Sequence, residues 1–239
     1  ITSYPKLLID RYSFFLMDTE TLERYYPVID NVSAFKEALS RPLPYYILVN
    51  TLRIRPDRLK GFLERDGFKT TPLPWLSNAL RVEKTHSGLG NHWTYLAGLF
   101  QIQEASAMIP ALVLAPQPEE RVLDLCAAPG NKTAQMAIAL NNQGTVVAND
   151  PVSRRLKPLR AAIYRMGLIN VSTICRDGLS LPKSAGTFDC VLVDVPCSCE
   201  GTSRKRPKVL RQPVKNVAQL IKKQKRLLNQ ALRFCRNGG

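Results

Sequence analysis

Short apolar runs alternate with amphipathic stretches along the second half of the chain. Val122, Leu123 and Leu125 form the first such run, which is typical of a strand buried on both faces. The pattern predicts strands at 121–125, 145–149, 171–175 and 190–194, and helices at 131–140, 153–166 and 214–234. The last helix has a predicted apolar stripe at Val217, Ile221, Leu228, Ala231 and Leu232. Because strands and helices alternate, we expect an α/β fold with a parallel sheet.

The first half of the chain carries shorter patterns of both kinds. Helices are predicted at 4–17, at 33–39 with Ser33 as the N-cap, and from Pro56 to about residue 65, where Gly67 ends the helix. Strands are predicted at 45–52, 68–71 and 79–82, followed by an apolar, mostly helical stretch at 96–114. Trp75 and Trp93 either stack on nucleic-acid bases or pack in a core or interface.

These elements divide the chain into three parts. Residues 1–40 are a helical segment, residues 41–95 a small β-α-β module, and residues 96–239 the main domain. The main domain is expected to have a Rossmann-like parallel sheet. This sheet is expected to be cut at its fourth strand, because Asn237, Gly238 and Gly239 look like a helix end that leads into a further strand.

The composition is that of a soluble globular protein, since 45% of the 239 residues are hydrophobic and 22% are charged. No run approaches the ~18–20 apolar residues of a membrane span, so we expect no membrane partner. The six cysteines are scattered, and they make neither a disulfide framework nor a pair of CxxC zinc motifs. The scattered cysteines indicate a reducing cytosolic or nuclear compartment, of which we expect the cytoplasm. We also expect a monomer that holds no metal.

Positive charge is concentrated at the C-terminal end. The net charge is +15, and residues 201–239 hold twelve Lys or Arg and no acid, whereas the first 200 residues hold 22 bases and 19 acids. Such a block either binds a polyanion or is a solvated face. The complete absence of acids favours nucleic acid, with the first cluster of bases as the candidate contacts: Arg204, Lys205, Arg206 and Lys208.

The turn after the first strand, from Cys126 to Lys132, restricts the class of ligand. Its small residues Ala127, Ala128 and Gly130 let a ligand approach the backbone closely. A dinucleotide site has GxGxxG at this place and a P-loop has GxxxxGK[ST], but the turn contains a single glycine. The sequence therefore argues against NAD, FAD and ATP.

Acids follow the next three strands, at Asp150, Asp177 and Asp194. Each of them alone is as readily a helix cap or a surface turn. Together, at equivalent strand ends, they favour a nucleoside that carries positive charge, and S-adenosylmethionine, a sulfonium, is such a ligand. Asp150 is in the position where a carboxylate accepts hydrogen bonds from ribose hydroxyls.

The fourth strand ends in Asp194-Val195-Pro196-Cys197, which places a thiol after the proline. A thiolate that adds to C6 of cytosine allows C5 to accept a methyl group, which is covalent catalysis. The other interpretation of Cys197 is a small buried residue, the usual environment of a free cysteine. The flanking Asp and Pro favour the functional interpretation.

Four stretches resemble the RNA cytosine-5 methyltransferases of the Sun/Nop2 (NSUN, RsmB/RsmF) family, and the bacterial ribosomal RNA members most: Asn50–Arg53, Phe100–Ser106, Asp124–Thr133 and Asp194–Ser198. The resemblance runs over nearly all of residues 41–239. It implies a class I S-adenosylmethionine-dependent methyltransferase domain, preceded by an RRM-like RNA-binding module at 41–95. It also implies methyl transfer to C5 of a cytosine in RNA, with ribosomal RNA favoured over transfer RNA.

The resemblance assigns a role to each matching residue. The methionine and ribose parts of the cofactor would contact Cys126, Ala127, Ala128, Pro129, Gly130, Asn131 and Lys132. Asp150 would hold the ribose hydroxyls, and Asp177 would lie near the adenine. Asp194, which is expected at the cofactor as well, would contact the target cytosine together with Lys132. Cys197 would assist product release.

Three departures from the family pattern bear on these roles. Asn131 stands where Gly or Ser is usual, and Cys199 stands where Gly is usual. The family's nucleophile comes from a Thr-Cys motif at the end of the next strand. None of the six cysteines matches that position, so we expect the nucleophile beyond Gly239. Two alternatives stay open: a non-catalytic RNA-binding protein or fragment that keeps the methyltransferase fold, or an enzyme that uses Cys197 itself as nucleophile.

Overall fold

The computed structural model describes residues 19–41, 43–83, 88–204 and 217–238, and the chain divides into two units. The smaller unit comprises Ile1–Leu43 with Cys197–Asn216, and the larger unit comprises Pro44–Pro196 with Val217–Gly239. The helix predicted at 4–17 lies outside the described residues.

The smaller unit contains η1 (Thr19–Val28), α1 (Val32–Ser40) and η5 (Glu200–Thr202). At the start of α1 the Asn31 side chain accepts a hydrogen bond from Ala34 N–H at 2.8 Å. The predicted cap at Ser33 is therefore wrong, because Asn31 supplies the side-chain acceptor two residues earlier.

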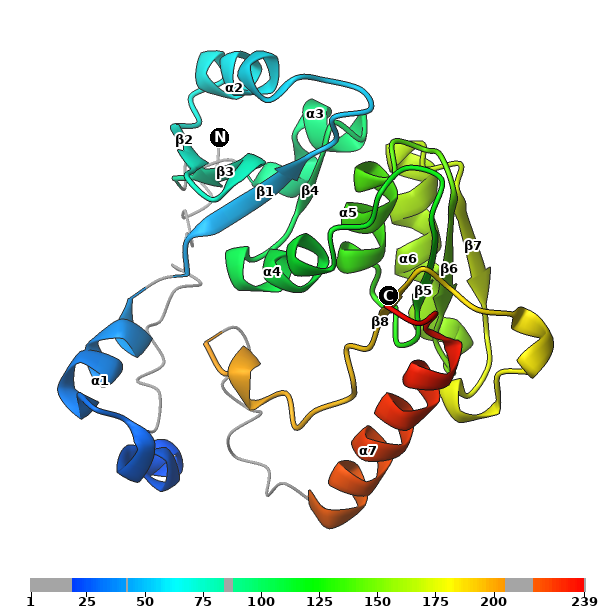
Figure 1. The fold of residues 1–239 in the computed structure, drawn as a ribbon. Coiled ribbons are helices and arrows are strands. Elements are labelled where there is room, and N and C mark those ends of the chain that lie inside the picture. The colour runs from blue at the N-terminus through cyan, green and yellow to red at the C-terminus, as the bar shows by residue number, and fades with distance from the viewer. Residues whose placement is uncertain (1–18, 42, 84–87, 205–216, 239) are drawn as a thin grey trace, which may run out of the picture. The chain divides into compact units, whose positions relative to one another are not determined.

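The larger unit begins with an antiparallel sheet in the order β2-β3-β1-β4 (Figure 1). Its strands are β1 (Tyr45–Val49), β2 (Thr70–Leu73), β3 (Leu76–Val82) and β4 (Phe100–Ile102), and its helices are α2 (Pro56–Arg65), η2 (Leu89–Asn91) and α3 (Trp93–Leu96). β4 pairs with β1, and Gln101 lies opposite Leu48. The predicted helical stretch from residue 96 is thus wrong at 100–102, where side chains alternate between the two faces of a sheet.

Alternate residues of β1 belong to different cores. Ile47 and Val49 pack with Leu59 and Leu63 of α2. Leu48 belongs instead to the core that includes residues of α4 (Ala105–Leu114) and α5 (Asn131–Ala139). Because successive side chains of a strand point to opposite faces, β1 is buried on both sides, and Leu48 on its second face joins the core of the main domain.

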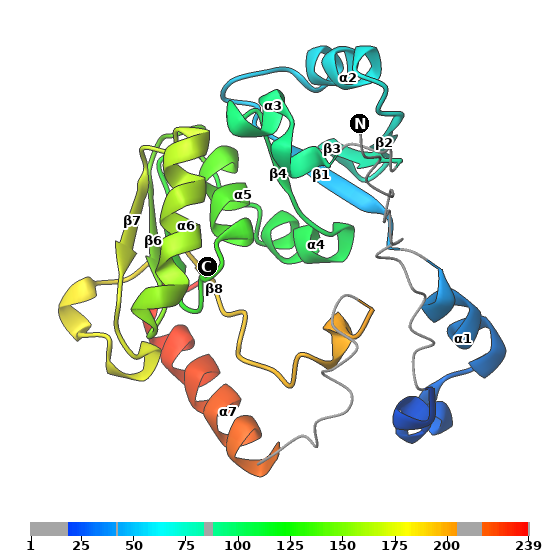
Figure 2. The same cartoon turned by 180° about the vertical axis from the view of Figure 1, so that it is seen from behind.

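The second sheet is parallel and has the order β7-β6-β5-β8 (Figure 2). Its strands are β5 (Arg121–Asp124), β6 (Thr145–Asn149), β7 (Val171–Ile174) and β8 (Cys190–Leu192). The remaining elements of the unit are α6 (Ser153–Met166), η3 (Gly178–Ser180), η4 (Lys183–Ala185) and α7 (Val217–Phe234). The predicted α/β fold with a parallel sheet is confirmed, and each of its four strands ends within two residues of the predicted bound.

Both faces of the parallel sheet are covered, as is usual for such sheets. Val122 of β5 packs in one core with Met136 of α5. The next residue, Leu123, packs in another core with Leu227 and Phe234 of α7. The continuous apolar run that predicted this strand therefore reflects burial on two sides.

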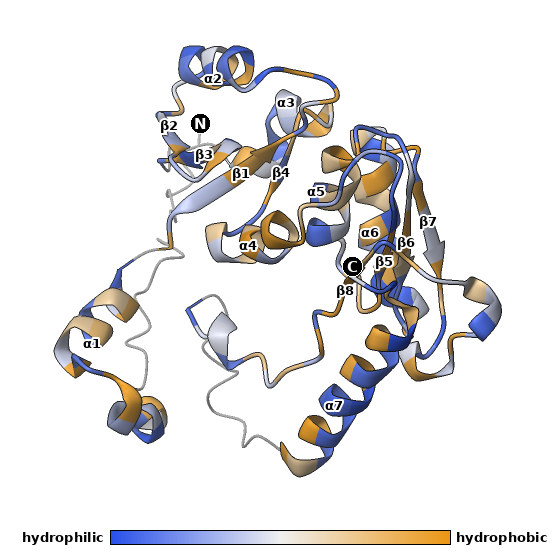
Figure 3. Ribbon diagram, in the orientation of Figure 1, coloured by the Kyte–Doolittle hydropathy of each residue, from blue (hydrophilic) through white to orange (hydrophobic). Residues whose placement is uncertain are grey.

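α7 carries apolar and polar residues side by side along its length (Figure 3). Its buried residues are Leu227, Ala231 and Phe234. The predicted apolar stripe is wrong except at Ala231, because four of its members are exposed: Val217, Ile221, Leu228 and Leu232. None of the described helices combines the length and hydropathy needed to cross a membrane.

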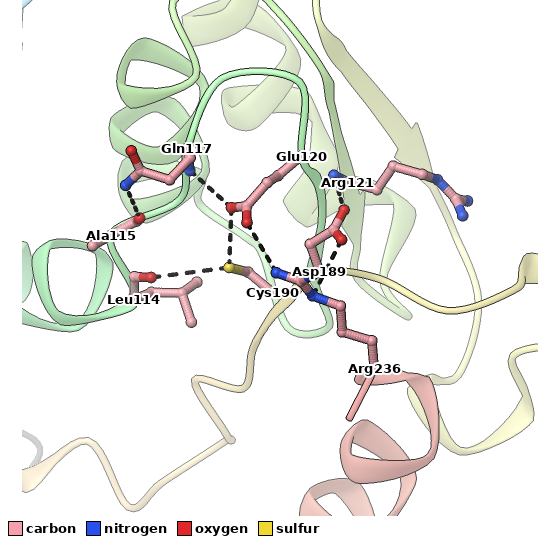
Figure 4. A network of polar contacts seen from close by, with 8 residues as sticks. All are labelled: Leu114, Ala115, Gln117, Glu120, Arg121, Asp189, Cys190 and Arg236. Carbon is pink, nitrogen blue, oxygen red and sulfur yellow. Dashed lines mark hydrogen bonds and ion pairs between the residues drawn. The ribbon is translucent and has the colours of Figure 1, made fainter. Parts of the chain in front are cut away.

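A polar network closes the edge of the sheet at which β5 and β8 begin (Figure 4). Glu120 accepts a hydrogen bond from Gln117 N–H at 2.8 Å, and its other carboxylate oxygen lies 3.3 Å from Nη2 of Arg236. Asp189 accepts from Arg121 N–H at 2.8 Å and lies 3.3 Å from Nε of the same Arg236. Arg236 thus connects the end of α7 to the beginnings of both strands. The predicted cofactor residues follow the four strands at the opposite, carboxyl edge of this sheet.

Candidate active site

The start of the turn from Cys126 to Gly130 is fixed to the neighbouring strand end by hydrogen bonds. Ala127 N–H donates a hydrogen bond to Asn149 O at 2.8 Å. The fully buried Asn149 side chain donates from Nδ2 to Leu125 O at 3.0 Å and accepts from Arg176 N–H at 3.1 Å. One asparagine therefore ties together the residues that follow β5, β6 and β7.

Gly130 is required by the contact between this turn and α6. Its φ is +107°, in the region that favours glycine. A Cβ at this position would lie 2.8 Å from Cγ of Leu159. A side chain at Gly130 would therefore point at α6. The sequence analysis had linked this glycine to the approach of a ligand and did not indicate its contact with a helix.

Asp150 follows β6, and its side chain is only 1% exposed. Oδ1 accepts a hydrogen bond from Val152 N–H at 3.0 Å. Oδ2 lies 3.1 Å from Nη1 of Arg155 but receives no hydrogen bond from the described residues. Arg155 also donates to Ala128 O at 2.9 Å, so it connects Asp150 to the turn. A buried carboxylate oxygen that lacks a hydrogen-bond donor fits a ligand that brings hydroxyl groups, as a ribose does.

Lys132 and Asp194 are brought together by the fold. Lys132 lies in the first turn of α5, and its Nζ is 2.7 Å from Oδ2 of Asp194, which follows β8. The Asp194 side chain is 58% exposed, so this ion pair contributes little to stability. The carboxylate is therefore held in place by an ammonium group while it stays accessible to solvent.

Asp124, the last residue of β5, is buried next to this pair. Its Oδ2 accepts a hydrogen bond from Oγ1 of Thr133 at 2.7 Å. Burial raises the pKa of the Asp124 carboxyl to about 7, against the opposing effects of the Thr133 hydroxyl and the Lys132 charge. This carboxyl therefore changes its charge near neutral pH, within the predicted site.

The remaining predicted cofactor residues have other local partners. Asp177 is exposed, and its Oδ1 accepts a hydrogen bond from Leu179 N–H at 3.0 Å at the start of η3. It thus acts as a cap, the alternative that the sequence left open. Cys126 is half-buried, and burial raises the pKa of its thiol to about 11. Cys126 therefore stays protonated at neutral pH.

Cys197 belongs to the smaller unit, together with the residues that follow it. It is exposed, so it is not the small buried residue of the alternative interpretation. Its Sγ accepts a hydrogen bond from Cys199 N–H at 3.4 Å. Cys199 has a φ of +63°, and this left-handed backbone conformation explains why glycine is usual at its position.

The basic cluster is described only at Arg204, because Lys205, Arg206 and Lys208 lie outside the described residues. Arg204 donates a hydrogen bond from Nη2 to the backbone oxygen of Arg41. This predicted RNA contact therefore has a partner inside the smaller unit, which the sequence did not indicate.

Two residues that the sequence analysis did not single out contact the turn and the helix after it. Arg155 binds both Asp150 and the turn, but it lies in a basic helix in which no local pattern distinguishes it. Gln101 donates from Nε2 to Oδ1 of Asn131 at 2.8 Å. The feature of the sequence that could have pointed to Gln101 is its place within the Phe100–Ser106 motif. Across the described ranges, no group of three or more His, Cys, Asp or Glu is placed to hold a metal ion.

Comparisons with known proteins identify the family. Residues 111–239 match the sequence model of 16S rRNA methyltransferase RsmB/F, and residues 18–105 match that of the N-terminal domain of 16S rRNA methyltransferase RsmF. The ribosomal RNA small subunit methyltransferase F of Citrobacter koseri is 39% identical over 215 residues, which are 86% of this chain and 44% of that protein. The chain therefore spans about half the length of the curated relatives it matches.

Solved structures give the same answer for the fold. A methyltransferase homolog protein from Pyrococcus horikoshii is 31% identical, with a TM-score of 0.74 over 84% of this chain and 64% of that one. NSun6 from the same organism has a TM-score of 0.81 over 92% of this chain and 81% of that one, and at 22% identity it shows the fold alone. By its sequence and its fold, the chain belongs to the RsmB/F family of 16S rRNA methyltransferases.

Proposed function

We propose that this protein transfers a methyl group from S-adenosylmethionine to C5 of a cytosine in ribosomal RNA. The observation that carries the proposal is the 2.7 Å contact between Lys132 and Asp194 at the carboxyl edge of the parallel sheet, where ligands bind in open α/β folds. The relatives named ribosomal RNA small subunit methyltransferase F support the RNA as substrate and methyl transfer as reaction.

The cofactor would be held by the turn and by the acids that follow β6 and β7. Residues 126–132 would contact its methionine and ribose parts. The Asp150 oxygen that receives no hydrogen bond from the described residues would accept from the ribose hydroxyls, and Asp177 would lie near the adenine. When bound, S-adenosylmethionine supplies an activated methyl group.

The target cytosine would bind at Asp194. A carboxylate accepts a hydrogen bond from the exocyclic amino group of cytosine, and Lys132 holds the Asp194 side chain in position for this contact. Methyl transfer to C5 requires a thiolate bonded to C6. The C5 proton must then leave, and the C6–S bond must break, to restore the aromatic ring. We assign Cys197 to the release step and expect the nucleophile beyond Gly239.

The basic cluster at 204–208 would bind the phosphate backbone of the RNA. Lys205, Arg206 and Lys208 carry this proposal, because Arg204 already donates to Arg41. The sheet that contains β1 and β4 would be the RNA-binding module, and it extends past residue 95 through β4.

The test measures methyl transfer to small-subunit ribosomal RNA by this chain and by a chain continued past Gly239 in the natural reading frame, with nucleoside analysis of the product. 5-Methylcytidine supports the proposal, and exclusively N-methylated nucleosides contradict it. RNA binding without methyl transfer, unchanged by Asp150→Ala, identifies the protein as a non-catalytic RNA binder. A covalent adduct of this chain with 5-fluorocytosine RNA, abolished by Cys197→Ser, assigns the nucleophile to Cys197.

A further inference from the structure

Gln101 in β4 and Gln103, the residue that follows this strand, bind two successive turns of α5. Gln101 donates from Nε2 to Oδ1 of Asn131 at 2.8 Å, and Gln103 donates from Nε2 to Oε1 of Gln135 at 3.1 Å. Residues two apart on a strand and four apart on a helix are separated by similar distances, about 6–7 Å. The two pairs therefore fix the register of α5 against the strand, with Asn131 at the end nearer the cofactor turn.

Arg165 sets the direction of the Gln101 amide. It donates from Nη2 to Oε1 of Gln101. A guanidinium group has donors only, so the oxygen of Gln101 must face Arg165 and the nitrogen must face Asn131. Arg165 is itself fixed, because its Nη1 donates to Tyr95 O at 2.6 Å and to Phe100 O at 3.0 Å, and its guanidinium lies 3.9 Å from the centre of the Tyr95 ring.

The same argument continues to Asn131. Because Gln101 offers a donor, Asn131 must present its oxygen to Gln101, and its remaining group is the Nδ2 donor. Asn131 is the first residue of α5 and follows Gly130 directly. A fixed sequence of donors and acceptors thus runs from α6 through β4 to the turn.

We propose that Gln101 is a positioning residue for cofactor binding, which holds Asn131 so that its amide offers a donor to the ligand. The matching group on S-adenosylmethionine is an acceptor, and the carboxylate of its methionine part is the strongest one. This inference rests on the proposed function, and it also makes the antiparallel sheet part of the cofactor site.

Gln103 provides a matched control on the same face of the same segment. It makes an amide–amide hydrogen bond to α5 one turn farther from the cofactor turn, and its Nε2 also donates to Ala107 O at 3.0 Å. Both glutamines are buried, with 2% exposure for Gln103 and 9% for Gln101. A purely structural role predicts similar effects of Gln101→Leu and Gln103→Leu. A positioning role predicts that only Gln101→Leu lowers the affinity for S-adenosylmethionine.

The experiment measures the Kd of S-adenosylmethionine by isothermal titration calorimetry, with the Tm of each variant, on the 239-residue chain. Gln101→Leu and Asn131→Ala are each expected to weaken binding about 10-fold to 100-fold, the range of one hydrogen bond to a charged group. Combining them should weaken binding no further than either change alone. Gln103→Leu should lower Tm and leave Kd within about twofold, because neither of its hydrogen bonds, to Gln135 and to Ala107, reaches the turn.

A second variant keeps the test decisive if Gln101→Leu does not fold. Gln101→Glu keeps an acceptor for Arg165 but has no donor for Asn131, and it is expected to weaken binding as Asn131→Ala does. Equal losses of affinity in Gln101→Leu and Gln103→Leu, additive losses in the double variant, or full affinity in Gln101→Glu would overturn the positioning role alone. Failure of the unaltered chain to bind S-adenosylmethionine would instead contradict the proposed cofactor.

Discussion

The Lys132 ammonium lies 2.7 Å from the Asp194 carboxylate, which joins the first turn of α5 to the segment after β8. If this pair holds the target cytosine, Lys132→Met and Asp194→Asn should each lower kcat for methyl transfer about 100-fold or more, as the loss of one preorganised polar contact does in other enzymes. The unfolding free energy should change by less than about 1 kcal/mol, because an exposed ion pair contributes little. Steady-state kinetics of the active protein and urea unfolding measure the two quantities.

The control is Lys157→Met, which changes an exposed lysine on α6. Equal activity of Lys132→Met and Lys157→Met would exclude a role of Lys132 in the reaction.

Asp150 supplies a test of the cofactor site. Asp150→Asn should weaken S-adenosylmethionine binding about 10-fold to 100-fold, because hydrogen bonds to a charged acceptor contribute about 1.5–3 kcal/mol each. Titration calorimetry measures the change in Kd. Asp57→Asn on α2, a carboxylate paired with Arg55, should leave Kd unchanged. Unaltered affinity in Asp150→Asn would show that the buried oxygen does not receive the ribose hydroxyls.

Asp124 makes the stability of the fold depend on pH. Burial raises its pKa to about 7 from an ordinary value of 3.8. Between these values the unfolded chain has released a proton that the folded chain still holds. The unfolding free energy therefore falls as pH rises, by at most about 1.4 kcal/mol per pH unit, and this contribution becomes constant above the folded pKa.

Asp124→Asn keeps an acceptor for Thr133 and removes the titrating group. Urea unfolding at pH 5, 6 and 8 should show a smaller loss of stability with rising pH in the variant than in the unaltered chain. Parallel pH profiles of the two proteins would show that Asp124 titrates at its ordinary pKa.

Gly130 is expected to tolerate no side chain. Gly130→Ala should lower the unfolding free energy by about 1–3 kcal/mol, because its Cβ would overlap Leu159 and its φ is positive. The cost should be smaller in a Leu159→Ala background, which removes the nearest atom. Gly61→Ala on α2, where a Cβ meets no atom within 4 Å, should instead stabilise by about 0.5–1 kcal/mol. Equal effects at Gly130 and Gly61 would refute the packing argument.

The basic cluster should make RNA binding depend on salt. Each phosphate that a base neutralises contributes about −0.7 to the slope of log K against log salt for single strands. Changing Lys205, Arg206 and Lys208 to Ser should flatten this slope, while Arg204 is left in place because it donates to Arg41. Filter binding over a range of salt concentrations gives the slope. An unchanged slope would show that the cluster is a solvated face that does not bind the RNA phosphates.

Much of the parallel sheet could be predicted because short apolar runs alternate with helical patterns along this part of the chain, and in β5 the run reflects burial on both faces at Val122 and Leu123. β6 and α6 have the predicted bounds, and the acids after three strands could be placed at one edge from topology alone. β4 was missed because three residues inside an apolar stretch carry too little periodicity to separate a strand from a helix. The buried face of α7 was missed because apolar residues occur on both of its sides.

The contacts that support the site could not be predicted in the same way. Gln101 and Asn131 are 30 residues apart, and Arg165 is a further 34 residues along the chain. Local propensity and periodicity carry no information on pairs at such separations. The same holds for Arg155, whose two partners lie in the turn and at the end of the neighbouring strand.

β1 contributes Ile47 and Val49 to one core and Leu48 to the other. The core that α4 and α5 share is therefore incomplete without Leu48 of this strand. The module and the parallel-sheet domain thus belong to one compact unit, although they follow one another along the chain. A module taken from a relative would consequently have to present a side chain that fits the place of Leu48 in the core of α4 and α5.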